Sequence, residues 1–296
     1  MSMKFNLYSL YPELFKSFVD TSLVARAIAK DIISINTINW RKYGKTAHMT
    51  VDDKPYGGGN GMVLKFEPMM DALVDNSALN TDYFHLYAKQ QVENPNWPNN
   101  TIFESQVRLI NHTKKANILL TPRGYTLNQN TCQWLASNFD ELNIICGRFE
   151  GFDQRLNQFI DLEISIGDYI LNGGEVGAMV LVESVSRLVD GFITKKGSIE
   201  HDSFSTTNNH YREQEQYSKQ EFSNGHKNMA IFDQEHWLSK IDQYEHPQYT
   251  RPQALPNQYT KMITNIGFKT DVPPEIVSGD HKLVQQIRAK GLRGAL

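Results

Sequence analysis

Residues 165–175 read Ser-Ile-Gly-Asp-Tyr-Ile-Leu-Asn-Gly-Gly-Glu. The apolar residues at 162, 164 and 166 lead into this stretch as a strand would, and Gly167 breaks the run. Paired glycines at 173 and 174 allow positive φ and let the backbone approach a ligand closely. Glu175 then opens an apolar helix. A strand, a glycine loop and a helix start can hold a polar cofactor through backbone groups, although an ordinary strand–turn–helix has the same pattern.

Two other apolar runs, Ile118–Gly124 and Ile144–Gly151, end in glycine loops in the same way. Three strand ends of this kind predict one crevice at the carboxyl edge of a parallel sheet, where open α/β sheets bind ligands. Other runs predict strands at 4–10 and 32–40, and helices at 12–19 (Pro12 first), 21–30 (capped by Thr21), 73–79 and 131–139. Strands that alternate with helices favour an α/β fold with a parallel sheet.

The composition sets bounds on the class of protein. A chain of 296 residues with 40% hydrophobic residues is long enough for one large or two medium domains. Its net charge of −3 argues against a protein that coats nucleic acid by bulk charge, but not against a local basic patch. There is no signal-peptide run and no stretch of about 18 apolar residues, and Cys132 and Cys146 form neither a disulfide framework nor a CxxC pair. We expect a soluble, cytoplasmic protein with no membrane part.

The character of the chain changes after Thr194. Residues 204–246 hold four Lys or Arg against seven Asp or Glu and few aliphatic residues, which predicts a surface insertion. Residues 281–296 carry four basic side chains and no acidic one. This basic end could contact phosphates, or it could form a solvated surface helix.

Several common catalytic motifs are absent from the sequence. Gly44-Lys45-Thr46 ends like a P-loop, but the first glycine of that motif would fall at Asn39. The chain has no HExxH zinc motif and no GxSxG nucleophile elbow. A kinase, an ATPase, a zinc hydrolase or a serine hydrolase is therefore poorly supported.

Longer stretches match one family, in the family's order and over most of the chain. They are Ser9–Phe15, Val51–Met62, Cys146–Asp153, Ser165–Glu175, Ala178–Gly191, Asp202–Phe204, His246–Pro252, Val272–Pro274 and Ser278–His281. In these stretches the sequence resembles the TrmD family, the bacterial tRNA (guanine-N(1)-)-methyltransferases of the knotted SPOUT class. The resemblance implies transfer of a methyl group from S-adenosylmethionine to N(1) of the guanosine at position 37 of tRNA, beside the anticodon.

The resemblance also implies the architecture. A parallel-sheet SPOUT methyltransferase domain with a deep C-terminal trefoil knot would cover 1–193, and a linker at 194–203 would carry the catalytic aspartate. The polar insertion at 204–246 would follow, and then a smaller, mainly helical and shortened tRNA-binding domain at 247–296. The family works as a homodimer, in which the linker of one subunit completes the active site of its partner.

The family's donor contacts fall on the three glycine loops of this sequence. The resemblance places them at Leu119, Leu120, Thr121, Pro122, Gly124, Gly147, Glu150, Ile166, Gly167, Asp168, Tyr169, Ile170, Leu171, Gly173 and Gly174. Most would act through backbone groups, which suits recognition of adenine. Glu150 is also a candidate Mg²⁺ ligand, because a magnesium requirement in the family is linked to this acidic position. No carboxylate cluster surrounds it in the sequence, so such a site would be open and shared with the substrate.

Two side chains would carry the chemistry. Guanine N(1) must lose its proton before it can attack, and a carboxylate within hydrogen-bond reach can take that proton. Negative charge then moves to the exocyclic oxygen, where a guanidinium stabilises it. The resemblance assigns these roles to Asp202 and Arg187, for which a helix cap and a surface ion pair are the structural alternatives. It assigns substrate binding to Asp53, Lys54, Tyr56, Gly59 and Arg148. For Arg148, bracing of its own loop is the structural alternative.

The chain departs from the family's pattern in three places. The connection at 75–115 is longer than usual, and the insertion at 204–246 separates two motifs that normally lie close together. The final helices that grip the anticodon arm have no counterpart after Lys290. Two other functions therefore stay open: an RNA methyltransferase of the same class with a changed target, and a binding-only protein that has lost catalysis. The retained Asp202 and Arg187 argue against the second.

Overall fold

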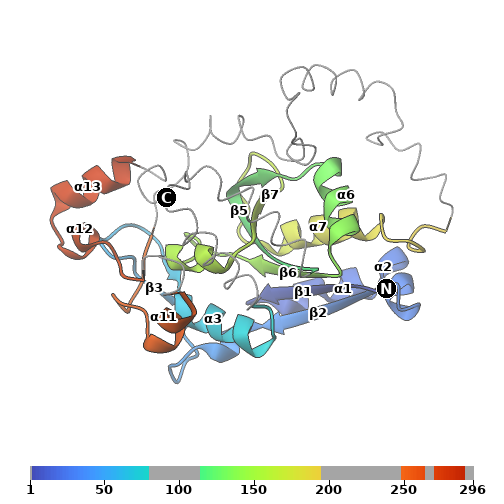
Figure 1. Cartoon of the computed structure of the whole chain (residues 1–296), viewed down its shortest axis with the longest axis horizontal. Coiled ribbons are helices and arrows are strands. Elements are labelled where there is room, and N and C mark those ends of the chain that lie inside the picture. The colour runs from blue at the N-terminus through green and yellow to red at the C-terminus, as the bar shows by residue number, and fades with distance from the viewer. Residues whose placement is uncertain (1, 80–113, 195–247, 264–269, 291–296) are drawn as a thin grey trace, which may run out of the picture.

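A computed structural model of the chain describes residues 2–79, 114–194, 248–263 and 270–290 (Figure 1). Its centre is a five-stranded sheet in the order β2-β1-β6-β5-β7, in which every neighbouring pair runs parallel. The strands are β1 (Met3–Ser9), β2 (Ile33–Asn39), β5 (Lys115–Thr126), β6 (Glu141–Cys146) and β7 (Leu162–Ser165). The predicted α/β fold with a parallel sheet is confirmed. Two short antiparallel strands, β3 (Asp52–Asp53) and β4 (Val63–Leu64), lie outside this sheet.

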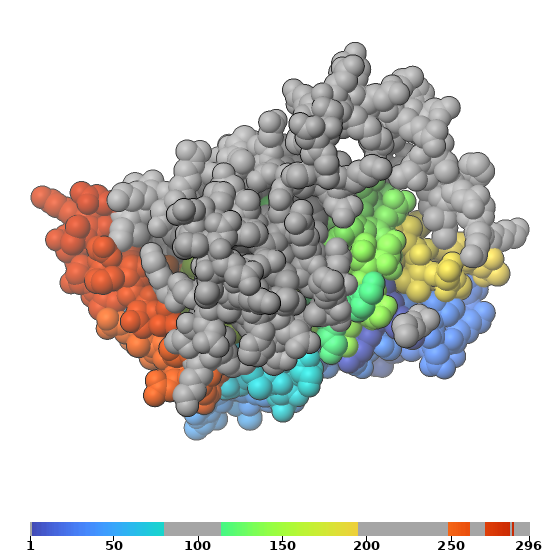
Figure 2. Space-filling view, in the orientation of Figure 1, coloured from blue at the N-terminus to red at the C-terminus, as the bar shows by residue number. Residues whose placement is uncertain are grey.

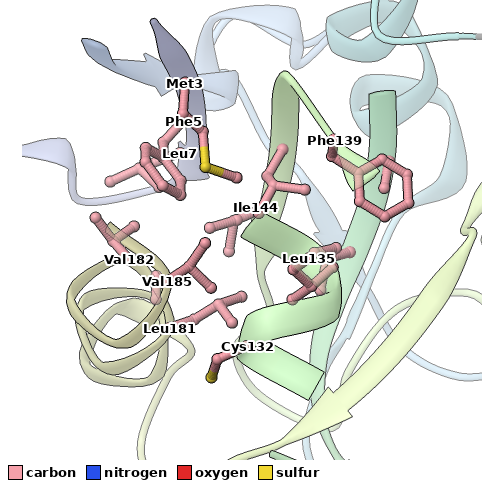
Figure 3. Packing of buried hydrophobic residues seen from close by; sticks show 14 of the residues in the cluster. Met3, Phe5, Leu7, Cys132, Leu135, Phe139, Ile144, Leu181, Val182 and Val185 are labelled. Atoms are coloured by element: carbon pink, nitrogen blue, oxygen red, sulfur yellow. The ribbon is translucent and has the colours of Figure 1, made fainter. Parts of the chain in front are cut away.

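One face of the sheet is covered by three helices. They are α2 (Ser22–Ala29), α6 (Gln129–Asn138) and α7 (Glu175–Ser186). Two short helices, η1 (Pro12–Phe15) and α1 (Lys16–Val19), precede α2 in the chain and belong to the same layer. Figure 3 shows side chains of α6 and α7 facing those of β1 and β6, with Val182 and Val185 near Phe5 and Leu7. Strands buried on both faces are nearly continuous apolar runs, which is why these segments could be found in the sequence.

The opposite face packs against α3 (Phe66–Asp75), η2 (Trp40–Tyr43) and η4 (Gln154–Phe159). The buried side chains of α3 include Phe66, Met69, Met70 and Leu73, which recur at helical spacing and form one apolar stripe. These elements enclose a second hydrophobic core between themselves and the sheet, which includes Leu119 of β5.

A row of asparagines crosses the sheet at one register. Asn36, Asn6, Asn143 and Asn117 lie opposite one another on β2, β1, β6 and β5. The side-chain amide of Asn36 donates to Asn6 at 3.0 Å, that of Asn6 to Asn143 at 2.7 Å, and that of Asn143 to Asn117 at 2.9 Å. The amide of Asn117 continues the row to the carbonyl oxygen of Phe159 at 3.1 Å. Asn6, Asn143 and Asn117 are buried, and these bonds satisfy amide groups that burial would otherwise leave without partners.

The C-terminal helices lie at the end of the molecule opposite α1 and α2 (Figures 1 and 2). They are α11 (Asn257–Ile263), α12 (Pro274–Val277) and α13 (His281–Lys290). Tyr259 of α11 packs edge-on against Phe66 with 5.4 Å between the ring centres, so α11 belongs to the second core. The predicted linker and insertion fall almost wholly in 195–247, which lies outside the described residues, and the predicted domain boundaries stay predictions. No helix within the described ranges is long and apolar enough to cross a membrane.

Some predicted elements differ from the structure. The helix predicted at 73–79 begins earlier and ends earlier, at Phe66 and Asp75. Pro68 does not break it, because it lies in the first turn, where a missing N–H is tolerated. The helix predicted at 12–19 divides into η1 and α1. Thr21 precedes α2 as predicted, but its hydroxyl donates to the carbonyl oxygen of Ser17 and does not cap the helix. The elements predicted at 4–10, 32–40 and 131–139 are found within two residues of their predicted ends.

Candidate active site

Residues 119–123 within β5 and the carboxyl ends of β6 and β7 surround a cavity of about 340 Å³. It is lined by residues 119–123, 147–152, 164–167 and 169–174, with Gln154, Gly177 and Gln248. This volume falls within the range of about 300–1,000 Å³ that is usual for small-molecule sites. The crevice predicted from the three glycine loops is therefore present.

The first loop is a bulge inside β5, and the prediction that the strand ends here was wrong. β5 pairs with β7 up to Leu120, bulges at 121–124 and resumes pairing at Tyr125. Gly124 permits this return, because a Cβ there would lie only 2.4 Å from the backbone nitrogen of Ile164. Without a side chain at 124, the strand closes against β7, while the rest of the bulge lines the cavity.

The second loop, 147–151, is joined to the third by backbone contacts. The N–H of Gly174 donates to the carbonyl oxygen of Gly147 at 2.9 Å, and Arg148 forms an isolated bridge with Gly173. A Cβ on Gly174 would lie 2.8 Å from the Cα of Cys146, so only glycine allows this approach. The two loops therefore behave as one wall of the cavity.

The third loop lines the cavity and also exposes apolar side chains. The hydroxyl of Tyr169 donates to the carbonyl oxygen of Ile166 at 3.1 Å and closes the turn around Gly167, whose φ is +149°. Tyr169, Ile170 and Leu171 are 55%, 79% and 39% exposed. Consecutive exposed apolar residues of this kind are typical of a surface that another molecule covers.

A buried ion pair ties the second loop to the start of α7. The guanidinium of Arg148 lies 2.9 Å from the carboxylate of Glu175, whose side chain is only 2% exposed. The hydroxyl of Ser9 donates to the same carboxylate at 2.7 Å. Glu175 is in the first turn of α7, where the helix dipole favours a negative charge. The guanidinium also lies over the ring of Tyr11, 4.4 Å from its centre, so Arg148 is held from two sides.

A second guanidinium group braces the other end of the cavity. Arg123 donates to both carboxylate oxygens of Glu163, at 2.9 and 3.2 Å, and to the side-chain oxygen of Gln154 at 3.0 Å. This two-bond geometry fixes the direction of the guanidinium plane. The bulge of β5 is thereby attached both to β7 and to the residue that begins η4.

The comparisons with known proteins identify the family. The sequence pattern of the family described as "tRNA (Guanine-1)-methyltransferase TrmD" matches residues 3–91 and 99–245. The chain belongs to the TrmD family. Similar proteins include the tRNA (guanine-N(1)-)-methyltransferase of Endomicrobium trichonymphae, which is 32% identical over 97% of this chain and 93% of that protein. The corresponding protein of Malacoplasma penetrans is 37% identical over 76% of this chain and 82% of its own length.

A solved structure also matches the chain. It is the crystal structure of a tRNA (m1G37) methyltransferase from Aquifex aeolicus, with 26% sequence identity and a TM-score of 0.49. The match covers 97% of this chain and 87% of that chain.

Most of the donor contacts that the TrmD resemblance implies line the cavity. Gly124 and Asp168 are the exceptions, and Gly124 has the packing role described above. The cavity also includes Arg123, Gln154 and Gln248, which the resemblance did not assign. Nothing in the sequence around the two glutamines marks them as cavity residues, because they come together only through the fold.

The predicted substrate residues Asp53, Lys54, Tyr56 and Gly59 are not in the cavity lining, but their loop lies beside it. The contact is made by Gly61, where a Cβ would lie 2.5 Å from the carboxylate of Glu150. The N–H of Glu150 also donates to the carbonyl oxygen of Met62 at 3.1 Å. The glycine-rich loop that follows β3 therefore meets the second cavity loop at Glu150.

The predicted catalytic pair is only half described. Arg187 caps the C-terminal end of α7 and is partly buried, outside the cavity lining. Asp202 lies outside the described residues. Among the residues that the structure describes, no group of three or more His, Cys, Asp or Glu side chains could hold a metal ion. The roles of Asp202, Arg187 and Glu150 stay predictions.

Proposed function

We propose that this chain transfers a methyl group from S-adenosylmethionine to N(1) of the guanosine at position 37 of tRNA. Membership of the TrmD family supports the reaction class. The single structural observation that carries the proposal is the cavity enclosed by the three glycine loops at the carboxyl edge of the sheet.

The residues of the cavity fit the proposed donor. The walls combine apolar side chains such as Leu119 and Ile164 with the backbone of Gly147, Gly173 and Gly174. Glycines expose backbone N–H and carbonyl groups that can read an adenine edge, and apolar walls suit its ring. When bound, S-adenosylmethionine supplies an electrophilic methyl group. The role of the protein is to hold that group facing the guanine and to exclude water.

The proposed chemistry needs one base and one cation. Asp202 would accept the proton from guanine N(1), and the guanidinium of Arg187 would stabilise the charge that develops on the exocyclic oxygen. Glu150 would help to place the guanosine, and a Mg²⁺ ion at this position would share its ligands with the substrate. Asp53, Lys54, Tyr56, Gly59 and Arg148 would form the entry for the flipped nucleoside, whose extrusion costs a few kcal/mol.

We also propose that the chain works as a homodimer in the cytoplasm. The apolar side chains Ile170, Leu171, Val176 and Val180 are 79%, 39%, 55% and 41% exposed, on the third loop and on α7. Val176 and Val180 are four residues apart and share one helix face. A second copy of the chain would cover this surface, next to the cavity, and its linker would then bring Asp202 to the partner's site.

The decisive experiment follows transfer of labelled methyl from S-adenosylmethionine to a tRNA with guanosine at positions 36 and 37. A tRNA with adenosine at 37 and the Asp202→Asn enzyme are the two controls, and we expect transfer only in the complete reaction. Transfer to another RNA position would mean a changed target. Donor binding without transfer to any RNA would mean a binding-only protein.

The dimer has a separate test. An Asp202→Ala subunit and a subunit with a mutated cavity are each expected to be inactive alone, and a mixture of the two should regain activity. A demonstrated heterodimer with no regained activity would contradict the proposed exchange of linkers.

A further inference from the structure

The return segment, residues 248–253, is attached to the core by a buried ion pair. The side chains of Asp153 and Arg155 are fully buried and 2.7 Å apart. Arg155 also donates to the carbonyl oxygens of Thr250 and Pro252, each at 2.8 Å. The carboxylate of Asp153 accepts from the N–H of Thr250 at 2.6 Å and from its hydroxyl at 2.8 Å. Every polar group of this anchor therefore has a partner inside the protein.

The same segment reaches the cavity. Gln248 lines it, and its carbonyl oxygen accepts from the N–H of Gln154 at 2.9 Å. Gln154 lines the cavity beside it and accepts from Arg123, the guanidinium that Glu163 holds. Three residues from distant parts of the chain thus form one end of the cavity. Arg123 belongs to β5, Gln154 begins η4 in the layer that covers one face of the sheet, and Gln248 belongs to the return segment.

We propose that the return segment is a wall of the donor-binding site, and that Asp153 and Arg155 are positioning residues that hold this wall in place. This inference rests on the function proposed above. The donor would contact Gln248, and the ion pair would affect donor binding by holding Gln248 in place. A ligand that contacts the segment binds best to molecules in which the segment is attached, so attachment and donor binding strengthen each other.

On this inference the three glycine loops are not sufficient for donor binding. Residues that come after 195–247 in the sequence would be needed for donor binding itself, and not only for RNA recognition. Tyr249 and Thr250 are buried, and the carbonyl oxygen of Tyr249 accepts from the N–H of Tyr56 at 2.9 Å. The segment is therefore placed by contacts on both of its sides.

The test changes the anchor without leaving a buried charge alone. Thr250→Val removes the hydroxyl that donates to Asp153 and keeps the shape of the side chain, whereas Thr250→Ser keeps the hydroxyl. Thr260→Val is a matched control, since the Thr260 hydroxyl donates to backbone carbonyl oxygens of Leu255 and Pro256, away from the cavity. The Kd for S-adenosylmethionine is measured by calorimetry on each full-length chain.

We expect Thr250→Val to raise this Kd about tenfold, because a hydrogen bond to a buried charged group is lost. Thr250→Ser should stay within about twofold of the unaltered chain, and Thr260→Val should leave the Kd unchanged. Hydrogen exchange gives a second readout: the donor should slow exchange of the Thr250 amide, and not that of Tyr259. If the anchor is purely structural, Thr250→Val will leave the Kd unchanged, and the donor will not slow exchange of the Thr250 amide.

The outcomes separate the two proposals. Equal donor affinity in the unaltered chain and in Thr250→Val would overturn the inference and leave the proposed function standing. An unaltered chain that binds no donor would overturn both.

Discussion

Gly124 lies so close to Ile164 that a Cβ at 124 would be 2.4 Å from the backbone nitrogen of Ile164 and 2.5 Å from the carbonyl carbon of Glu163. Both contacts are to backbone atoms of β7, which cannot move aside as a side chain can. We therefore expect Gly124→Ala to lower the free energy of unfolding by about 3 kcal/mol, the upper part of the range for overpacking. Denaturant unfolding measures this directly. A stability loss within error of zero would show that the bulge closes without the glycine.

Gly147→Ala should affect binding and not folding. The nearest atoms to a Cβ at 147 are a ring carbon of Phe152 at 3.6 Å and the carbonyl oxygen of Leu120 at 3.7 Å, which are ordinary contacts. Both neighbours line the cavity, so the added methyl group would occupy space near the ligand. We expect the Kd for S-adenosylmethionine to rise about tenfold with little change in stability. Calorimetry and unfolding on the same preparation separate the two effects.

Glu175→Gln should destabilise the protein more than the loss of an exposed ion pair. Arg148 would keep its charge while its partner in a site that is 2% exposed becomes neutral. Breaking a buried pair on one side costs about 3–5 kcal/mol, and we expect the lower end because the Arg148 side chain is partly exposed. The control is Asp20→Asn, which removes the exposed pair between Lys16 and Asp20. Equal stability of the two variants would refute the proposed bracing role of Arg148.

Asp161 should make stability depend on pH. Burial raises the pKa of its carboxyl from 3.8 to about 7, although the N–H of Asn117 donates to it at 2.7 Å and opposes the rise. The folded protein then holds the proton more tightly than the unfolded chain. This contribution to stability is complete below about pH 4 and is lost as the pH rises through about 7. Asp161→Asn keeps an acceptor for Asn117 and removes the titration.

The measurement is the free energy of unfolding of both proteins between pH 4 and pH 8. We expect the difference between Asp161→Asn and the unaltered chain to grow in favour of the variant as the pH rises through this interval. Asp140→Asn, at an exposed aspartate, is the control. Parallel pH profiles for the unaltered chain and Asp161→Asn would contradict a raised pKa at Asp161.

Removal of metal tests the part assigned to Glu150. Since no group of three ligating side chains occurs among the described residues, we expect the chain without RNA to bind Mg²⁺ no more tightly than about 1 mM. EDTA should slow methyl transfer while donor binding is unchanged, and Glu150→Gln should remove the response to added Mg²⁺. Tight Mg²⁺ binding by the chain alone would contradict a site that is shared with the substrate.

The three cavity loops could be predicted from the sequence because each leaves a local signal. An apolar run followed by glycine marks the end of a buried strand, and Gly147 after β6 and Gly167 after β7 follow this rule. Gly173 comes later in the third loop, after exposed apolar residues, and marks no strand end. The bulge in β5 follows it only in part. The sequence shows the glycine at 124, but not the strand of β7 that receives Tyr125 on the far side of the bulge.

The end of the cavity that contains Gln248 could not be predicted in this way. Thr250 is 97 residues from Asp153 in the sequence, and several of the bonds between the return segment and the core involve backbone oxygens, which every residue has. Contacts of this kind leave no pattern of residue types. They follow from the fold of the whole chain and are visible only in the structure.

The asparagine row that crosses the sheet has one more consequence. Strands that are apolar on both faces can slide by two residues without turning any side chain to the other face. A slide of this kind between β1 and β6 would set Asn6 opposite Ile145, and its buried amide would lose the partner that it has in Asn143. The four asparagines thus fix the register of the strands. They select one of several strand arrangements that hydrophobicity alone would accept, and with it the relative level of the bulge in β5 and the loop after β6.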